Sequence, residues 1–311
     1  MEIRGKAPLR IGLAGGGTDL EYIFEKYGGA VVNITIDKFC HMSIKIRDDN
    51  KIFVNGYEER PFILKKILEN YEVPFGFDLI YYNDIQPGSG LGNSSSFVVL
   101  FLKIIDDLQN KVVDDFETIK QAHQIELHIK EGGWQDQYAT TFGGINFIEF
   151  NKEKRIYPLN LRYRFLCELN EHLLLVDIYG QKQQDIHKEL REYSETHNDE
   201  MEKTAKIKDL AFRMRDCLLN QRIDEIGKIL HENWELKRNK FTSNKNIDSL
   251  YKMARLNGAI GGKICGSGQA GHFLFFCKPK DRNNLINKIE SEGYKTVPFN
   301  FAKQGAETWR I

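Results

Sequence analysis

The first half of the chain alternates short apolar runs, which predict strands, with longer stretches of helical periodicity. Its predicted strands cover residues 9–14, 30–36, 39–47, 77–82 and 145–150. Its predicted helices cover residues 19–27, 62–70, 94–109 and 114–130, and a short one starts near residue 133. The helix at 94–109 is apolar on nearly every face, which indicates that it is buried on all sides.

The second half begins after a polar stretch, residues 151–164, where we place a domain boundary. The two domains are therefore expected to span residues 1–160 and 161–311. In the second domain the pattern predicts a strand at 172–178, a long charged helical stretch at 183–238, a helix at 248–256, strands at 262–265 and 272–277, a helix at 280–292 and a strand near 296–299. This mixed order of strands and helices predicts an α+β fold.

Composition excludes several classes of function. The 311 residues carry 44 Lys and Arg against 44 Asp and Glu, so the chain lacks the basic charge of a nucleic-acid-binding protein. Its longest apolar stretch, residues 97–105, is too short to cross a membrane, and the N-terminus lacks the apolar core of a signal peptide. Five cysteines at wide spacings include no CxxC pair, which indicates neither a zinc site nor a redox disulfide. We therefore expect a cytoplasmic protein with reduced cysteines and small-molecule partners, without nucleic acid or membrane as a partner.

The segment QPGSGLGNSSSFVV, residues 86–99, has the composition of a loop that surrounds an anion. Gly88, Gly90 and Gly92 occupy alternate positions, and glycine permits the positive φ angles and close backbone approach that such a loop needs. The serines at 94–96 stand where the next helix should start, and serine is a good N-cap. The N–H groups and positive dipole end of that helix then face the enclosed anion, a nucleotide phosphate. The alternative is a Gly/Ser-rich turn before a buried helix.

Two acidic residues further along are candidates for chemistry. Asp136 lies near the start of the short predicted helix, where a carboxylate is stabilised as the anion, and is a candidate general base. The alternative is an ordinary capping aspartate. Glu126, with a serine hydroxyl from the glycine-rich loop, is a candidate Mg²⁺ site, since Mg²⁺ takes few protein oxygens and several phosphate oxygens. The alternative is a solvated glutamate on a helix face.

Residues 266–271, GSGQAG, match the GxGxxG pattern of dinucleotide-binding proteins. That pattern requires a helix that opens within it, whereas HFLFFC at 272–277 is typical of a strand. We therefore interpret the segment as a glycine-rich hairpin that closely approaches another element or a ligand. No GxxxxGK[ST] sequence occurs, so a Walker-type phosphate loop is excluded.

Three segments in fixed order resemble the GHMP kinases, the superfamily of galactokinase, homoserine kinase, mevalonate kinase and phosphomevalonate kinase. They are LRIGLAGGGTDL at 9–20, PGSGLGNSSS at 87–96 and KICGSGQAGHF at 263–273. The middle segment is similar to the family's phosphate loop, and GWQDQ at 133–137 resembles the stretch with its catalytic aspartate. The resemblance implies an N-terminal domain like ribosomal protein S5 domain 2, a ferredoxin-like C-terminal domain, and ATP in the cleft between them.

The resemblance also implies roles for the matching positions. Asp136 matches the base that takes a proton from the attacking hydroxyl, and Arg10 lies where sugar kinases of the family place an arginine near the reacting centre. Ser94 and Glu126 match the ligands of Mg²⁺. ATP is expected on Pro87, Gly88, Ser89, Gly90, Leu91, Gly92, Asn93, Ser94, Ser95 and Ser96. The sugar is expected on Lys6, Arg10, Gly15, Gly16, Gly17, Thr18, Asp19, Gly266, Ser267 and Gly268, with Asp19 against its hydroxyl groups.

A departure from the galactokinase pattern narrows the substrate. Galactokinases have a Glu-His pair in the first motif where this chain has Gly16 and Gly17, which adds space and free backbone N–H groups. This change favours a longer sugar that carries its own phosphate, with Lys6 or Arg10 as the basic partner. The alternative is that the glycines serve only the turn.

Within the superfamily the motifs most resemble the D-glycero-D-manno-heptose 7-phosphate kinases. These enzymes phosphorylate the anomeric hydroxyl to give the 1,7-bisphosphate, on the way to nucleotide-activated heptose for surface polysaccharide. One alternative is another anomeric sugar kinase, similar to L-fucokinase or galactokinase. The other is a non-catalytic sugar and ATP sensor of the same fold.

Overall fold

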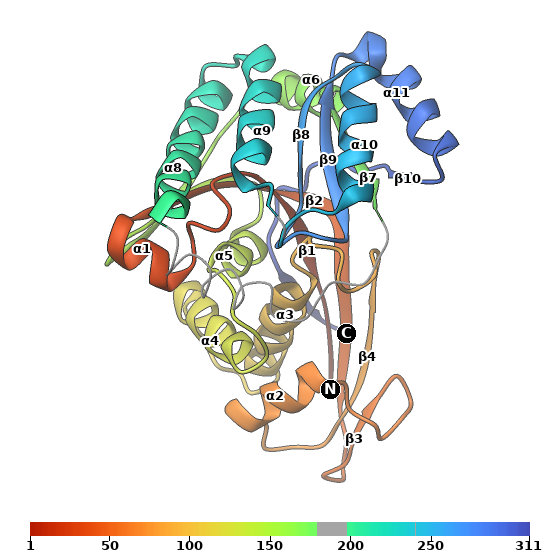
Figure 1. The fold of residues 1–311 in the computed structure, drawn as a ribbon. Helices are drawn as coiled ribbons and strands as arrows, with labels where there is room; N and C mark the ends of the chain where they lie inside the picture. Colours follow the sequence, from red (N-terminus) through yellow and green to blue (C-terminus); the bar gives the residue numbers. More distant parts are fainter. Residues whose placement is uncertain (179–197, 240) are drawn as a thin grey trace.

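The computed structural model of the chain describes residues 1–178, 198–239 and 241–311. Within these residues the chain forms two β-sheets, and helices pack against both (Figure 1). The larger sheet has the strand order β11-β1-β2-β4-β3, with β5 paired to β2 and β6 paired to β5. Its strands are β1 (Glu2–Ala14), β2 (Gly29–Ile46), β3 (Ile52–Val54), β4 (Phe77–Asn83), β5 (Ile145–Phe150), β6 (Lys154–Pro158) and β11 (Glu307–Arg310).

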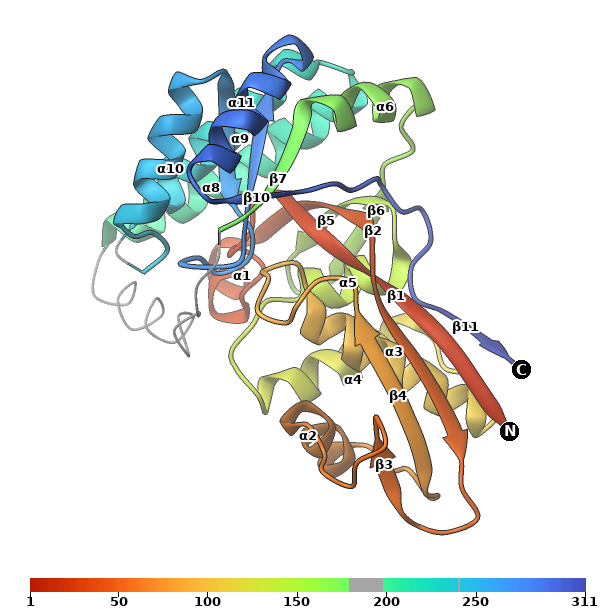
Figure 2. The same cartoon turned by 90° about the vertical axis from the view of Figure 1, so that its right-hand side faces the viewer.

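The helices of the first half gather mainly on one face of this sheet (Figure 2). They are α1 (Glu21–Tyr27), α2 (Phe62–Asn70), α3 (Asn93–Leu108), α4 (Asp115–Leu127) and α5 (Gln135–Phe142). α3 packs on β1 and β2 and is flanked by α2, α4 and α5. Every residue from Phe97 to Leu102 is buried, which confirms the predicted helix that is covered on all sides.

The smaller sheet has the strand order β10-β7-β9-β8, and its neighbouring strands are all antiparallel. Its strands are β7 (Leu173–Asp177), β8 (Ala259–Ile264), β9 (His272–Cys277) and β10 (Lys295–Val297). The helices around it are α6 (Tyr163–His172), α8 (Asn198–Leu219), α9 (Ile223–Lys237), α10 (Lys245–Leu256) and α11 (Pro279–Ser291). From one edge of this sheet to the other stand the fourth, first, third and second of its strands along the chain, which is the strand order of a ferredoxin-like sandwich. The predicted α+β class is confirmed.

One hydrophobic core joins the two sheets. Leu13 of β1, Met214 of α8 and Phe276 of β9 belong to the same buried cluster, with α8 and α9 packed at the junction. The other face of the smaller sheet packs on α10 and α11, for example through Phe275 and Leu285. Because apolar surface is buried continuously across the junction, the two halves can build one site together.

Some elements escaped the sequence-based prediction. β3, β6, α6 and β11 were not predicted, and the two strands expected at 30–36 and 39–47 form the single strand β2. The expected boundary at residue 160 falls between β6 and α6, but β11 returns from the second segment to pair with β1. The two ends of the chain therefore lie side by side (Figure 2). Of the helical stretch expected at 183–238, residues 183–197 lie outside the described residues.

In the part of the chain that the structure describes, no helix is long and apolar enough to cross a membrane. The five cysteines are free thiols, of which Cys167 alone is exposed.

Candidate active site

A cavity of about 930 Å³ opens between the two halves of the chain. Its walls come from β1 and the loop after it, from the glycine-rich loop at 86–92, from the first turns of α3 and α5, and from α4. The second half adds the last residue of α9, one residue of β8 and the hairpin after β8. The predicted site residues that line the cavity are Arg10, Gly16, Gly17, Asp19, Pro87, Gly88, Gly90, Gly92, Asn93, Ser94, Ser95, Glu126, Asp136, Gly266 and Ser267.

The glycine-rich loop has the backbone conformation that its sequence predicts. Gly88, Gly90 and Gly92 have φ angles of 87°, 79° and 86°, in the left-handed region that favours glycine. The backbone N–H of Arg10 donates to the carbonyl of Leu91 at 2.9 Å, which fixes the loop to β1.

The serines after this loop do not cap α3, so that prediction is wrong. The N-cap of α3 is Gly92, and no side chain caps the helix. Ser95 Oγ donates to the Glu126 carboxylate at 2.7 Å, and Ser96 Oγ donates to the carbonyl of Pro8 at 3.0 Å. The first turn of α3 lines the cavity, so its N–H groups are left available there for an anion.

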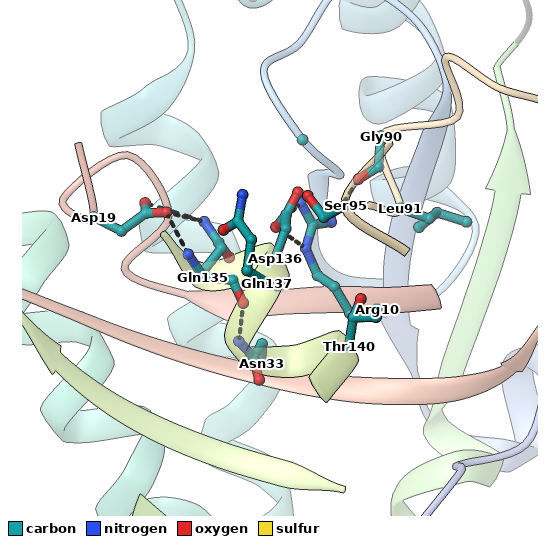
Figure 3. A network of polar contacts seen from close by, with 12 residues as sticks. Arg10, Asp19, Asn33, Gly90, Leu91, Ser95, Gln135, Asp136, Gln137 and Thr140 are labelled. Atoms are coloured by element: carbon teal, nitrogen blue, oxygen red, sulfur yellow. Dashed lines mark hydrogen bonds and ion pairs between the residues drawn. The ribbon is translucent and has the colours of Figure 1, made fainter. Parts of the chain in front are cut away.

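Asp136 and Arg10, which both line the cavity, point toward each other (Figure 3). Arg10 Nε donates to Asp136 Oδ1 at 2.6 Å, and Arg10 Nη1 donates to the carbonyl of Gly90 at 2.6 Å. The Arg10 side chain is 6% exposed and that of Asp136 is 24% exposed. A Cβ at Gly92 would lie 3.6 Å from Asp136 Oδ2, so the loop, the arginine and the aspartate converge. A phosphate on the loop and a hydroxyl group in the cavity would meet at this point.

Glu126 lies among neutral polar groups at the edge of the same cavity. Its Oε2 accepts hydrogen bonds from Ser95 Oγ at 2.7 Å and from Gln137 Nε2 at 2.5 Å, and Ser94 is a further hydrogen-bonding neighbour. Burial raises the pKa of Glu126. Gln137 Oε1 is buried and accepts no hydrogen bond among the described residues.

This set of oxygens fits Mg²⁺, which prefers carboxylate, amide and hydroxyl oxygens. A cation here would also offset the burial of the Glu126 carboxylate. In the described residues no three His, Cys, Asp or Glu side chains meet to hold a metal alone. Glu126, with the neighbouring hydroxyl groups of Ser94 and Ser95, would hold such an ion.

Asp19 is 2% exposed and is oriented by Gln135 (Figure 3). Gln135 Nε2 donates to both carboxylate oxygens at 3.1 Å, and the backbone N–H groups of Gln135 and Gly17 donate at 3.2 and 2.9 Å. Burial raises the pKa of Asp19. A Cβ at Gly133 would lie 1.9 Å from Asp19 Oδ2, so only glycine fits there. The turn that presents Asp136 thus also fixes the position of Asp19.

The loop after β1 has open space at Gly17, and both Gly16 and Gly17 line the cavity. A Cβ at Gly17 would have no atom within 4 Å. Gly15 and Thr18, predicted to contact the sugar, instead hold the loop in place. Thr18 Oγ1 donates to the carbonyls of Gly15 at 2.8 Å and Ala30 at 3.0 Å, and a Cβ at Gly15 would lie 1.9 Å from Ala30 O.

Lys6, predicted as a partner for a distal phosphate, lies outside the cavity. It precedes Arg10 by four residues in β1, and four extended residues span about 13 Å. Its Nζ is 3.7 Å from a carboxylate oxygen of Glu307 in β11. Lys6 is therefore rejected as a phosphate-binding residue.

The hairpin between β8 and β9 contacts the glycine-rich loop, which confirms the close approach that its glycines predict. Gly271 has φ 101°, and a Cβ there would lie 2.3 Å from the carbonyl oxygen of Ser89. His272 Nδ1 lies 3.0 Å from the same oxygen. Ser89 thus joins the two halves instead of lining the cavity. Leu91 does not line the cavity either, because its side chain is buried in the hydrophobic core between the halves. Gly268 packs against Thr242 and is also outside the cavity wall.

Two lysines in the cavity wall were missed by the sequence analysis. Lys237 Nζ donates to the carbonyl of Gly266 at 2.7 Å, and Lys263 Nζ donates to the carbonyl of Gly12 at 2.7 Å. Burial lowers the pKa of Lys237 to about 8 and that of Lys263 to about 7. Lys263 could have been recognised from the sequence as a candidate site residue, because it is the single charged residue in the apolar run 259–265. Lys237 ends a charged helical stretch and carried none.

Comparisons with known proteins agree with this architecture. The models of the GHMP kinase N-terminal and C-terminal domains match residues 59–144 and 214–295. The chain is 34% identical to a D-glycero-alpha-D-manno-heptose 7-phosphate kinase of Campylobacter jejuni, with 99% of each chain covered. Among solved structures, a D-glycero-D-manno-heptose 1-phosphate kinase of Bacteriodes thetaiotaomicron superposes with a TM-score of 0.80 at 29% identity over 99% of each chain. A sugar kinase of Campylobacter jejuni described as putative gives 0.77 at 31% identity, over 100% of this chain and 98% of its own. The paired domain matches and the full-length similarity show that the chain belongs to the GHMP kinases, a family of phosphotransferases.

Proposed function

We propose that this chain is an ATP-dependent sugar kinase that phosphorylates the anomeric hydroxyl of D-glycero-D-manno-heptose 7-phosphate. The product is the 1,7-bisphosphate, a precursor of nucleotide-activated heptose for surface polysaccharide. The observation that carries the proposal is the convergence of Asp136, Arg10 and the glycine-rich loop in one cavity with the open space at Gly17.

On the donor side, the ATP phosphates lie on the glycine-rich loop and the first turn of α3, where backbone N–H groups are available. Glu126, Ser94 and Ser95 would hold Mg²⁺, which when bound neutralises charge on the phosphates. Positioning and charge neutralisation are the main requirements of phosphoryl transfer.

On the acceptor side, the sugar hydroxyl oxygen attacks the γ-phosphorus, the bond to the β–γ bridging oxygen breaks, and ADP leaves. Asp136 takes the hydroxyl proton as general base. Arg10 orients the Asp136 carboxylate and adds positive charge next to the phosphoryl group in transfer. Asp19, held by Gln135, accepts hydrogen bonds from other hydroxyl groups of the sugar.

The names of two similar proteins differ in the substrate, since one is a heptose 7-phosphate kinase and the other a heptose 1-phosphate kinase. Both reactions give the same bisphosphate, so the product alone does not identify the substrate. We favour the 7-phosphate, because it stands in the name of the relative with the higher sequence identity, 34% against 29%.

The test is a coupled ADP-release assay with MgATP and a panel of acceptors. The panel contains heptose 7-phosphate, heptose 1-phosphate, the phosphate-free heptose, sedoheptulose 7-phosphate, mannose 6-phosphate, L-fucose and galactose. Each acceptor is run with the native chain, with Asp136→Asn and with Asp78→Asn. Asp78 is a matched control, because it also pairs with an arginine, Arg47, at 2.7 Å but lies outside the cavity.

Turnover of heptose 7-phosphate that is lost only in Asp136→Asn is the expected result. Preferred turnover of heptose 1-phosphate would show that the sugar binds in the opposite orientation, with its anomeric end away from Asp136. Preferred turnover of L-fucose or galactose would support a sugar kinase but would contradict the proposal that its substrate is a sugar phosphate. Tight ATP binding without turnover of any acceptor would favour a sensor of the same fold.

A further inference from the structure

The cavity wall contains two lysines that the proposed reaction does not use. Lys237 is the last residue of α9, and Lys263 belongs to β8 and is 3% exposed. Both line the cavity. They come from the second half of the chain, whereas Arg10 and Asp136 come from the first.

Neither lysine forms an ion pair with a carboxylate in the described part of the chain. Lys237 Nζ donates to the carbonyl of Gly266, and Lys263 Nζ donates to the carbonyls of Gly12 at 2.7 Å and Ile264 at 3.2 Å. An ammonium group has three N–H donors, so two remain at Lys237 and one at Lys263. Carbonyl groups hold the two cations in place without neutralising them.

Burial of an unpaired charge is unfavourable, and the pKa of each lysine is lowered mainly by that burial. The charge of Asp19 also acts on Lys237. However, the Asp19 carboxylate already accepts its hydrogen bonds from Gln135 and Gly17. An anion that entered the cavity would therefore be the direct partner of both ammonium groups.

The lysines lie at a useful distance from the reacting centre. Arg10 and Gly12 point to the same face of β1, and two residues along a strand span about 7 Å. Arg10 contacts the glycine-rich loop and Asp136, whereas Gly12 contacts Lys263. The direction from Arg10 to Gly12 thus leads away from the phosphate donor and toward Lys263, whose positive charge acts together with that of Lys237.

The other basic residues of the cavity wall are engaged elsewhere. Arg10 is bonded to Asp136 and Gly90. Lys130 is exposed beyond the end of α4, where its charge acts on Glu126, and the His123 ring is stacked on Trp134. Gly12, Gln135 and Lys263 lie close together, since a Cβ at Gly12 would lie a tight 3.2 Å from Gln135 Oε1 and 4.0 Å from Lys263 Nζ.

We propose that Lys237 and Lys263 form the subsite that binds the phosphate group already present on the sugar, at the end remote from the hydroxyl that reacts. The inference rests on the proposed function, because it assigns the phosphate recognition that a sugar phosphate kinase needs. It replaces Lys6 and Arg10 in that role. It also makes the second half of the chain the part that selects phosphorylated sugars.

The test measures selectivity between heptose 7-phosphate and the phosphate-free heptose in Lys237→Gln, Lys263→Gln and the double variant. Lys208→Gln is the matched control, because Lys208 Nζ also donates to a backbone carbonyl, that of Tyr27 at 2.8 Å, but outside the cavity. Each variant is assayed for kcat/KM and, without turnover, for binding of both sugars by titration calorimetry. Thermal unfolding of each variant verifies that it is folded.

Each single substitution is expected to lower kcat/KM and affinity for heptose 7-phosphate by about 10- to 100-fold, as loss of a charged hydrogen bond does. The phosphate-free heptose and the control variant should change little. Equal losses for both sugars would overturn the inference and place the lysines at the transferred phosphoryl group or in the fold. Unchanged selectivity in the double variant would overturn it as well.

The inference and the proposed function can fail separately. If the native chain prefers another phosphorylated sugar, for example mannose 6-phosphate, the heptose is wrong and the lysine variants are judged on that sugar and its phosphate-free form. If the native chain prefers sugars without phosphate, the lysine subsite is refuted while the kinase remains.

Discussion

Asp136 has two proposed roles: its charge balances that of Arg10 in the folded protein, and its carboxylate is the general base of the reaction. The substitution Asp136→Asn is expected to separate these roles. The Arg10 guanidinium is almost fully buried and always charged. Asparagine at 136 still offers an oxygen to Arg10 Nε, but it removes both the compensating charge and the proton acceptor. The substitution should therefore lower both stability and kcat, by amounts that have different physical origins.

The expected loss of stability follows from the burial of the two partners. An exposed pair contributes at most about 1 kcal/mol, whereas loss of one partner from a fully buried pair destabilises by about 3–5 kcal/mol. Arg10 is 6% exposed and Asp136 is 24% exposed, which places this pair between the limits. We expect the free energy of unfolding to fall by about 2 kcal/mol and kcat to fall by about 10²- to 10⁴-fold through loss of the base.

A double-mutant cycle measures both effects. The variants are Arg10→Met, Asp136→Asn and their combination, with unfolding followed in urea and single-turnover phosphoryl transfer followed at saturating ATP. The double variant should be less destabilised than the sum of the single variants, because no unpaired charge remains. Its kcat should remain as low as that of Asp136→Asn. Asp78→Asn should change the free energy of unfolding by less than about 1 kcal/mol, as expected for a more exposed pair.

One result would refute the reasoning directly. If Asp136→Asn lost stability as expected but kept its single-turnover rate within a few-fold, Asp136 would serve only to balance the charge of Arg10. The reaction would then need another proton acceptor or none.

Three further predictions follow from single positions. In Gly271→Ala the positive φ should lower the free energy of unfolding by about 1–3 kcal/mol, and the clash of the new Cβ with Ser89 O should lower it further. Gly293 also has a positive φ, 88°, but has open space around it, so Gly293→Ala should show only the loss caused by φ. Urea unfolding measures both variants. Glu126→Gln should raise the Mg²⁺ concentration for half-maximal activity by about tenfold or more, and an unchanged titration would remove Glu126 from the metal site. Because burial lowers the pKa of Lys263 from 10.5 to about 7, the unfolded chain binds more protons between these values. Stability should therefore rise with pH in that window, and Lys263→Met should flatten the rise in unfolding measurements across it.

The features predicted correctly from the sequence depend on short stretches of chain. The alternate glycines at 88, 90 and 92 require a particular backbone, so the loop could be recognised without its partners. The apolar run in α3 predicts burial whatever covers it. The hairpin at 266–271 was identified by the strand pattern on both sides of it.

The features that were missed or wrong depend on residues far apart in the chain. Ser95 is a reasonable N-cap by local rules, but its hydroxyl donates a hydrogen bond to Glu126 of α4 instead. The helix begins after Gly92, which has a positive φ, and no side chain caps it. The strand β11 is only four residues long, and it forms because the exposed edge of β1 is available to it. Lys6 and Arg10 are close in sequence, yet an extended strand carries Lys6 away from the cavity.

The same dependence on distant residues explains why the two ends of the cavity differ. The donor side, with the glycine-rich loop and Glu126, is built within the first half of the chain, and most of it could be predicted from that half alone. On the proposed acceptor side, Lys237 and Lys263 reach the cavity only because α8 and α9 pack across β1 and bring the smaller sheet against it. The hairpin that follows Lys263 ends at Gly271, which rests on the backbone of the glycine-rich loop. The hairpin that follows Lys263 is therefore also fixed to the glycine-rich loop, and this contact adds to the shared core in holding the two proposed sides of the cavity together.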